Sequence, residues 1–386
     1  MKHFAALYRH ELQAIIHDKG VLLIFIGAVI IYSFFYPIPY LPEVLKEVPV
    51  IAVDEDHTAL SRKLIRMADA SDLVRIAGQA ATVSEAEKRI KAGDMSGALV
   101  IPREFERKAL RGENATVGLF CDASYFLIYR QVMTGLLGAT KTLSAGIEIR
   151  KLQARGVMAI HAKAARNPIE LINRPLFNPT EGYASYVVPA VMVLILQQTL
   201  LIGIGMLGGT RQENIGQQNT ERNASPLMSV LSKVSVYLSI YFLHMIYYFF
   251  VVFSLYGFPQ KGTPFTIMSF MLPFLVSVSF LGIFINGFFR HRETSFQVLL
   301  FTSLPAIFLA GFAWPVEAIP AWLRPLSYLL PTTAGIEGFL RVSEMGASLR
   351  NVSFEWSVLW GLCILYGAMA WTTVALRQKT SHQAAG

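Results

Sequence analysis

The chain has 386 residues, of which 53% are hydrophobic and only 16% are charged. A soluble domain carries about 25% charged residues, so this composition excludes an ordinary soluble domain and indicates a membrane protein. The net charge of +8 fits the excess of Lys and Arg in the cytoplasmic loops of membrane proteins, and we expect no nucleic-acid partner. Two cysteines, Cys121 and Cys363, cannot form a disulfide framework.

Residues 1–19 have the pattern of an amphipathic helix. Apolar residues recur at helical spacing, and charged residues such as Arg9, Glu11 and Asp18 occupy other positions. We predict a cytoplasmic helix that lies in the inner membrane interface, the alternative being a frayed polar leader. Residues 20–42 then predict the first transmembrane helix, and its long apolar stretch indicates an anchor that is not cleaved.

Six runs of the chain contain no Asp, Glu, Lys or Arg and exceed the roughly 20 residues that a helix needs to cross a bilayer. The sequence therefore predicts an α-helical integral membrane protein with six transmembrane helices. The runs are Gly20–Pro42, Gly182–Thr210, Val234–Gln260, Gly262–Phe289, Thr294–Val316 and Trp356–Leu376.

Residues 43–181 separate the first two runs and predict an α/β domain with a long helical stalk. Short apolar strands alternate with helical patterns, beginning with the strands at Val48–Val53 and Leu73–Ala77. Thr82 and Glu85 form a capping box at the start of one helix. A continuous helical pattern over about residues 124–165 predicts the stalk.

No catalytic or metal-binding group is predicted in this insert. Asp54–His57 reads DEDH, but acidic residues between a strand and a helix favour the helix N-terminus, so capping is the preferred interpretation over a metal site. No acid–base or nucleophile pair stands out elsewhere. We therefore predict no catalytic residue, no metal, no cofactor bound by this chain, and no enzymatic activity of its own.

Residues 182–386 predict a domain of five transmembrane helices with a charged loop, 211–233, between its first two helices. The six runs lack the charged residues with which ion-coupled carriers bind ions. Gln197, Gln198 and Asn286 are expected to form hydrogen bonds between helices, and the alternative is that they line a substrate path.

The distribution of Lys and Arg predicts the orientation. Ten lie on the side of the two termini and of the 211–233 loop, and four lie in the opposite short loops. This bias places both termini in the cytoplasm and the insert 43–181 outside the cytoplasm.

A proline-rich segment follows the fifth run. Pro315, Pro320 and Pro331 prevent one continuous helix, and Trp322 is typical of a membrane interface. We predict that residues 317–331 form an external re-entrant segment of short helices shielded by protein, the alternative being a loop on the surface.

Three stretches resemble one family, the permease subunits of type-2 ABC exporters. They are the loop RQENIG with its following SPL, the approach NRPLFNP to the second run, and the proline-rich Leu309–Leu349. The insert, which opens with IAVDEDHTALSRKL, resembles the subgroup with a large external domain between its first two spans. The resemblance implies that Glu213, Asn214 and Gly216 couple the protein to an ATPase, with Arg211 orienting them.

The expected function is the membrane subunit of an ATP-driven exporter in a bacterial inner membrane. No phosphate-binding GxxxxGK[ST] loop is present, so ATP must be bound by a partner subunit. The resemblance implies ATPase subunits, a second permease protomer that is identical or homologous, surrounding lipids, and a drug-like, lipid or other amphiphilic cargo. A periplasmic adaptor is a further expected partner. The alternatives are an energy-independent or ion-coupled carrier, and a receptor or scaffold that works through its external domain.

Overall fold

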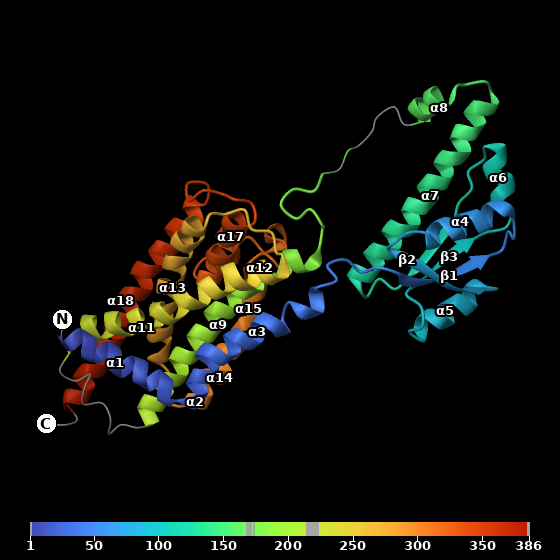
Figure 1. The fold of residues 1–386 in the computed structure, drawn as a ribbon. Coiled ribbons are helices and arrows are strands. Elements are labelled where there is room, and N and C mark those ends of the chain that lie inside the picture. Colours follow the sequence, from blue (N-terminus) through green and yellow to red (C-terminus); the bar gives the residue numbers. More distant parts are fainter. Residues whose placement is uncertain (1, 167–171, 173, 214–223, 384–386) are drawn as a thin grey trace. The chain divides into compact units, whose positions relative to one another are not determined.

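The computed structural model describes residues 2–166, 172, 174–213 and 224–383 (Figure 1). Contacts divide the chain into two compact units. The membrane unit holds Met1–Glu43 and Pro175–Gly386, and the insert unit holds Val44–Arg174. Several apolar helices and a mixed α/β sheet after the first membrane helix confirm the predicted fold class.

The insert unit is built on a four-stranded sheet, within the described residues, whose strand order is β2-β1-β3-β4. β1 pairs in parallel with β2 and with β3, whereas β4 pairs antiparallel with β3. Each strand is a short, largely apolar run bounded by turns, which is why the sequence pattern could predict it. The strands are β1 Val48–Asp54, β2 Val74–Ala80, β3 Gly97–Ile101 and β4 Gly118–Cys121.

Helices cover both faces of this sheet. On β1, Val48 and Val50 contact the core that includes α4 and α7, whereas Ile51 and Val53 contact the core that includes α5. β1 can serve both cores because successive side chains of a strand point to opposite faces, with a register shift between Val50 and Ile51. The helices are α4 Ala59–Asp69, α5 Val83–Lys91, α6 Phe105–Arg111, α7 Phe126–Ala154 and α8 Ala159–Arg166.

The continuous helical pattern over 124–165 forms two helices rather than one. α7 ends at Ala154, and Gly156 follows with a φ of +86°. That left-handed conformation is accessible to glycine and ends a helix, so α8 begins again only at Ala159.

The membrane unit begins with α1 and a first span that contains a π-helical segment, η1. α13, α14 and α17 pack against α9, whose apolar stretch is buried throughout. The elements are α1 Lys2–His17, α2 Lys19–Leu22, η1 Leu23–Ala28, α3 Val29–Phe35, η2 Ile38–Tyr40, α9 Tyr183–Glu213, α11 Pro226–Ile246, η4 Tyr247–Val252, α12 Phe253–Tyr256, α13 Pro264–Asn286, α14 Arg292–Phe301, α15 Ser303–Leu309, η5 Val316–Ala318, α16 Arg324–Ser327, α17 Pro331–Ser343 and α18 Ser353–Gln383.

Five helices in the described part of the chain are long and apolar enough to cross a membrane, one fewer than the six predicted. They are Lys19–Tyr40, Tyr183–Glu213, Pro226–Tyr256, Pro264–Asn286 and Ser353–Lys379. The run Thr294–Val316 instead contains the two shorter helices α14 and α15. Pro305 explains the division, because its ring clashes with the carbonyl of Phe301 and it has no N–H to donate there. α14 ends at that Phe301.

The divided pair α14–α15 nevertheless runs antiparallel along α9. The backbone N–H of Arg292 bonds to Glu213 at the end of α9. Ser295 and Leu299 face Gly205 farther up that helix. The hydroxyl of Tyr186, near the start of α9, donates to the carbonyl of Phe312. The pair therefore spans the length of a membrane helix although neither half does.

The proline-rich segment leads into α17, which is packed among the long helices. Pro331 begins this helix, and the next residue, Thr332, accepts a hydrogen bond from Gln197 at the middle of α9. Gly335 and Gly338 allow α17 to approach Phe274 and Phe270 of α13 closely. α17 ends near the start of α13, where Ser343 accepts the N–H of Lys261 at 2.7 Å.

The two chain positions that flank the insert unit are adjacent. Glu43 accepts hydrogen bonds from the Ser185 hydroxyl at 2.7 Å and the Ser185 N–H at 3.2 Å. The backbone carbonyl of Glu43 also accepts the N–H of Tyr183 at 2.9 Å. These bonds satisfy donors in the first turn of α9, so the exit of the first span is fixed beside the entrance of the second.

Candidate coupling site

The junction between α1 and the first span depends on Asp18. Its carboxylate accepts the backbone N–H groups of Gly20 at 3.0 Å and Val21 at 3.1 Å, and so caps α2. These are donors without a partner in the first turn of a helix, which is why an Asp at this position favours a helix start. Asp18 thereby fixes where the first span begins.

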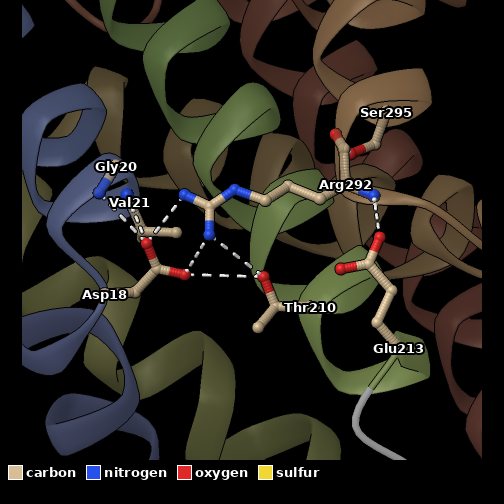
Figure 2. Close-up of polar contacts among 7 residues, drawn as sticks. All are labelled: Asp18, Gly20, Val21, Thr210, Glu213, Arg292 and Ser295. Carbon is tan, nitrogen blue, oxygen red and sulfur yellow. Dashed lines mark hydrogen bonds and ion pairs between the residues drawn. The ribbon is translucent and has the colours of Figure 1, made fainter.

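The same carboxylate binds the guanidinium of Arg292, the first residue of α14. Figure 2 shows the two groups facing one another, with nitrogen–oxygen distances of 2.7 and 2.8 Å. Thr210 of α9 lies 3.4 Å from both partners. A β-carbon at Gly20 would collide with the guanidinium. The cluster therefore requires a small residue beside a planar, bidentate cation.

The charge state of Asp18 follows from these contacts. Partial burial acts to raise the pKa of the Asp18 carboxyl, but the hydrogen bond and charge of Arg292 and the amides of Val21 and Gly20 outweigh burial. The pKa is therefore below the ordinary aspartate value, and the pair is ionised at neutral pH. The side chains of Asp18 and Arg292 are only 13% and 28% exposed, which distinguishes them from a surface ion pair.

Glu213 joins the end of α9 to the start of α14. Its Oε1 accepts the backbone N–H of Arg292 at 3.1 Å (Figure 2). The same oxygen lies 3.7 Å from Nδ1 of His291. A carboxylate at this position neutralises the positive end of the α14 dipole. Arg292 is therefore bonded twice, through its side chain to Asp18 and through its backbone to Glu213.

A second acid joins α1 to two other helices, α9 and α11, at this end of the unit. Glu11 of α1 is 1% exposed. It accepts hydrogen bonds from the guanidinium of Arg211 on α9 and from the hydroxyl of Tyr237 on α11. A buried carboxylate needs such partners, so loss of the Arg211 or Tyr237 side chain would leave Glu11 buried with one partner fewer.

Close packing brings the end of α9 against α13 and α14. A β-carbon at Gly209 would lie 2.6 Å from both N and Cα of Arg292, and one at Gly208 would overlap the side chain of Asn286. Arg377 of α18 completes this end by donating to the carbonyls of Asn286 at 2.9 Å and Gly287 at 3.0 Å. The last turn of α9 thus contacts several helices of the membrane unit.

The structure brings together only some of the predicted site residues. Arg211 and Glu213 lie in this cluster, with Asn286 beside it. Asn214 and Gly216, with the other residues of 214–223, lie outside the described residues. Gln197 and Gln198 lie at mid-length of α9, away from the cluster.

The predicted external residues lie in the proline-rich segment. Pro315 precedes the 3-10 turn η5, Pro320 and Trp322 are exposed, and Pro331 is buried at the first turn of α17. An apolar pocket of about 280 Å³ is formed there by residues of α15 and the following turns: Phe308, Leu309, Trp314, Ala318, Ile319, Pro320 and Leu323.

Four further residues of the site were not predicted from the sequence: Glu11, Asp18, Thr210 and Arg292. The sequence held a signal for Glu11, because Leu7 and Ile15, four residues before and after it, are both apolar; both are buried in the structure. Residues at this spacing share one helix face, so an acid there must meet a partner. No comparable local signal pairs Asp18 with Arg292, which is 274 positions away.

The DEDH turn of the insert unit is occupied by turn and capping bonds. Asp54 accepts from the Ser61 hydroxyl at 2.7 Å, and Asp56 accepts the N–H groups of Phe105 at 3.1 Å and Glu106 at 3.0 Å. Asp56 therefore fixes the start of α6. Among the described residues, no group of three or more His, Cys, Asp or Glu side chains is placed to hold a metal ion.

Comparison with known proteins gives consistent matches. The model of a family described as "ABC-2 family transporter protein" matches residues 19–372. "Probable multidrug ABC transporter permease YbhR" of Escherichia coli (strain K12) is 23% identical over 93% of this chain and 94% of its own length. "Inner membrane transport permease YhhJ" of that strain is 23% identical over 91% and 92%. "Probable multidrug ABC transporter permease YbhS" is 25% identical over 42% and 44%.

Proposed function

Because the chain belongs to the ABC-2 family of transporter proteins, we propose that it is the permease of an ATP-driven exporter whose ATPase subunits dock on residues 211–233. Two permease protomers, identical or homologous, form the substrate path between them. The complex lies in a bacterial inner membrane, with both termini in the cytoplasm and the insert unit outside. ATP binds to the partner subunits, in keeping with the lack of a phosphate-binding loop in this sequence.

The observation that carries this proposal is the double attachment of Arg292. The proposed docking segment 211–233 begins in the last turn of α9. That turn is bonded to α14 through Glu213 and contacts the Asp18–Arg292 pair through Thr210. Any displacement of the loop therefore acts on the start of α14 and on the start of the first span together.

The break between α14 and α15 is a position at which the chain can bend when the docking segment moves. Pro305 leaves the Phe301 carbonyl without its helical donor, and Thr302 and Ser303 turn their hydroxyls to the carbonyls of Leu299 and Leu300 at 2.6 Å. A helix interrupted in this way bends more easily than a continuous one. In our proposal, ATP-driven movement at Arg292 pivots α14 about this joint and opens a path along α9.

The cargo is proposed to be amphiphilic. YbhR and YbhS bear the description "probable multidrug", and the pocket at Phe308 and Trp314 in this chain is apolar. Gln197, Gln198 and Asn286 are the proposed polar groups of the path, and Pro315, Pro320, Trp322 and Pro331 belong to the proposed external re-entrant segment. The insert unit would receive cargo or bind a periplasmic adaptor.

The first experiment purifies the tagged full chain from membranes together with candidate ABC ATPase subunits. ATP hydrolysis and ATP-dependent export of an amphiphilic dye are then measured in liposomes. We expect wild type to bind one ATPase pair and to stimulate its hydrolysis. Failure to bind any ATPase subunit would overturn the proposed function. Dye export driven by a pH gradient without ATP would favour an ion-coupled carrier instead.

A matched pair of variants tests the coupling site. Glu213→Gln removes the charge that neutralises the start of α14, whereas Glu317→Gln changes an exposed acid in the 3-10 turn η5. We expect Glu213→Gln to retain ATPase binding but to reduce dye export per ATP hydrolysed, and Glu317→Gln to behave as wild type. Equal export per ATP in all three proteins would contradict the assignment of Glu213 while leaving the exporter proposal intact.

A further inference from the structure

The outer edge of strand β4 in the insert unit is uncovered. Leu119 and Phe120 on this four-residue strand are 36% and 42% exposed, although both are large and apolar. In the described part of the insert unit, β4 pairs only with β3. An apolar edge strand of this kind is a template for pairing with another strand.

The backbone groups at this edge can be identified from the sheet. Glu55 donates its N–H to the carbonyl of Ile101, so alternate residues of β3, namely Gly97, Leu99 and Ile101, direct their backbone groups towards β1. Ala98 therefore faces β4, where its partner is Phe120. Backbone direction alternates along a strand, so Leu119 directs both its N–H and its carbonyl away from the sheet, as do the residues two positions before and after it.

The opposite edge of the sheet, strand β2, is protected. Arg75 and Gln79 are exposed on it, and a charged side chain in an edge strand discourages pairing with another strand. Residues 114–121 contain no charged residue. The two edge strands of the sheet therefore differ in charge. Charged residues in an edge strand are what natural proteins use to prevent edge-to-edge association.

We propose that β4 pairs antiparallel with β4 of a second copy of this chain, with Leu119 opposite Leu119. This two-fold register joins all of the outward-facing backbone groups, since Val117 then pairs with Cys121 of the second copy. It also places Phe120 opposite Gly118 of the second copy, where the lack of a side chain leaves room for the ring.

The charges beside the strand are compatible with this register. Asp122, the first charged residue after β4, lies opposite Thr116 of the second copy rather than opposite another acid. Like charges directly opposite one another would destabilise a strand pair. A self-complementary, uncharged edge matches a second copy, and this pairing continues the sheet across the two insert units.

Cysteine cross-linking in membranes tests the contact on the full chain. Cys121 is replaced by Ser, and the remaining Cys363 is buried in the membrane unit. Leu119→Cys is then compared with Phe120→Cys and with Gln79→Cys on the opposite edge. Copper–phenanthroline oxidation should rapidly give a covalent dimer of Leu119→Cys, because the Cα atoms of a directly opposed pair lie about 5.5 Å apart.

The two control variants make the test specific. Phe120→Cys lies two residues out of register with its own counterpart and should form dimer several-fold more slowly, despite its similar exposure. Gln79→Cys should form only the background of random collisions. Equal rates at the three positions would overturn the contact, and faster reaction at Phe120→Cys would overturn the register. A product of Leu119→Cys with another polypeptide would overturn the second copy as partner.

Charge substitutions provide an independent check. Val117→Cys with the native Cys121 should cross-link between copies, and Leu119→Lys should reduce that product several-fold by placing like charges opposite one another. Co-expression of Leu119→Lys and Leu119→Asp copies with different tags should restore a mixed product. Absence of that restoration would overturn the two-fold pairing. None of these measurements needs an ATPase. Their outcome therefore tests the β4 contact independently of the proposed exporter function.

Discussion

Asp18 and Arg292 are 274 positions apart and bind one another through two hydrogen bonds of 2.7 and 2.8 Å. One residue starts the first span and the other starts α14. The pair is mostly buried, so it fixes the position of the start of one helix relative to the start of the other. The Thr210 hydroxyl lies 3.4 Å from the Asp18 carboxylate and 3.4 Å from the Arg292 guanidinium, so the end of α9 is held at the same place. The starts of the first span and of α14 and the end of α9 are thus held by one cluster.

The geometry of the guanidinium should matter as well as its charge. Arg292→Lys keeps the charge but loses the planar bidentate contact. We expect it to lower the free energy of unfolding by about 1 kcal/mol, and Arg292→Gln by about 2–3 kcal/mol, since Gln leaves the Asp18 carboxylate without its cation. Thermal unfolding in detergent measures both. An Arg292→Gln protein that melts at the wild-type temperature would contradict a stabilising role for the pair.

Arg341→Gln serves as the control for this comparison. Arg341 binds Glu355 at 2.6 Å and the carbonyl of Asn351 at 2.7 Å, far from α9's last turn. We expect the control to lose stability as well but to keep the wild-type ratio of export to ATP hydrolysis. Arg292 variants should lower that ratio.

The stability of the protein should depend on Glu344 between mild acid and mild alkali. Glu344 lies at the end of α17, is 9% exposed, and its Oε1 has no hydrogen-bond partner among the described residues. Burial raises the pKa of this carboxyl to about 8. In the unfolded chain the pKa of Glu is about 4.3, so the folded state holds the proton more tightly. The free energy of unfolding should therefore fall as pH rises between these two values.

Glu344→Gln keeps the shape and removes the titration. We expect the melting temperature of wild type to decrease from about pH 5 to about pH 9, and that of Glu344→Gln to change less over the same interval. Glu317→Gln, which alters an exposed acid, should keep the wild-type slope. A slope that is unchanged in Glu344→Gln would show that another group is responsible.

Packing at the end of α9 should not tolerate a methyl group. Gly209→Ala would place its β-carbon 2.6 Å from backbone atoms of Arg292, which cannot rotate away. We expect Gly209→Ala to lower the free energy of unfolding by about 1–3 kcal/mol or more and to displace α14. Gly361→Ala on α18 meets no atom within 4 Å and should be neutral or stabilising by up to about 1 kcal/mol, because Ala favours helix. Comparable melting temperatures for the two variants would contradict the close approach.

Two adjacent glutamines should respond in opposite ways to removal of their amides. Gln197 donates to Thr332, so Gln197→Met leaves a buried hydroxyl without that donor and should cost about 1–3 kcal/mol. Neither amide atom of Gln198 has a hydrogen-bond partner among the described residues. Gln198→Met should therefore be neutral or stabilising for folding. If Gln198 lines the cargo path, the same variant should reduce dye export, and both properties are measured on one preparation.

The sequence predicted elements wherever the signal was local. The strands of the insert unit and the long apolar helices follow from short apolar runs and from charge-free runs, respectively. The fifth predicted span is two helices because a charge-free run records only the absence of charge. It does not register Pro305, whose effect falls on the carbonyl of Phe301 four residues earlier. Gly156 likewise divides the predicted stalk into two helices, because its left-handed conformation ends α7.

The residues of the candidate coupling site show the limit of local patterns more clearly. Arg211 and Glu213 were selected through a resemblance, and the structure adds their partners. Glu11 was assigned to a position outside the apolar face of its helix, whereas it shares a face with Leu7 and Ile15, which are buried within the membrane unit. Its role became visible only with Arg211 and Tyr237 in place.

By itself, the sequence determined that this protein is a helical membrane protein with an α/β insert and no nucleotide-binding loop, because hydropathy, strand patterns and motifs are properties of neighbouring residues. Tertiary structure alone decided which charges pair, how closely α9 approaches α14, and which edge of the sheet stays open. Those features depend on contacts between distant segments, as between Asp18 and Arg292, and no periodicity along the chain records them.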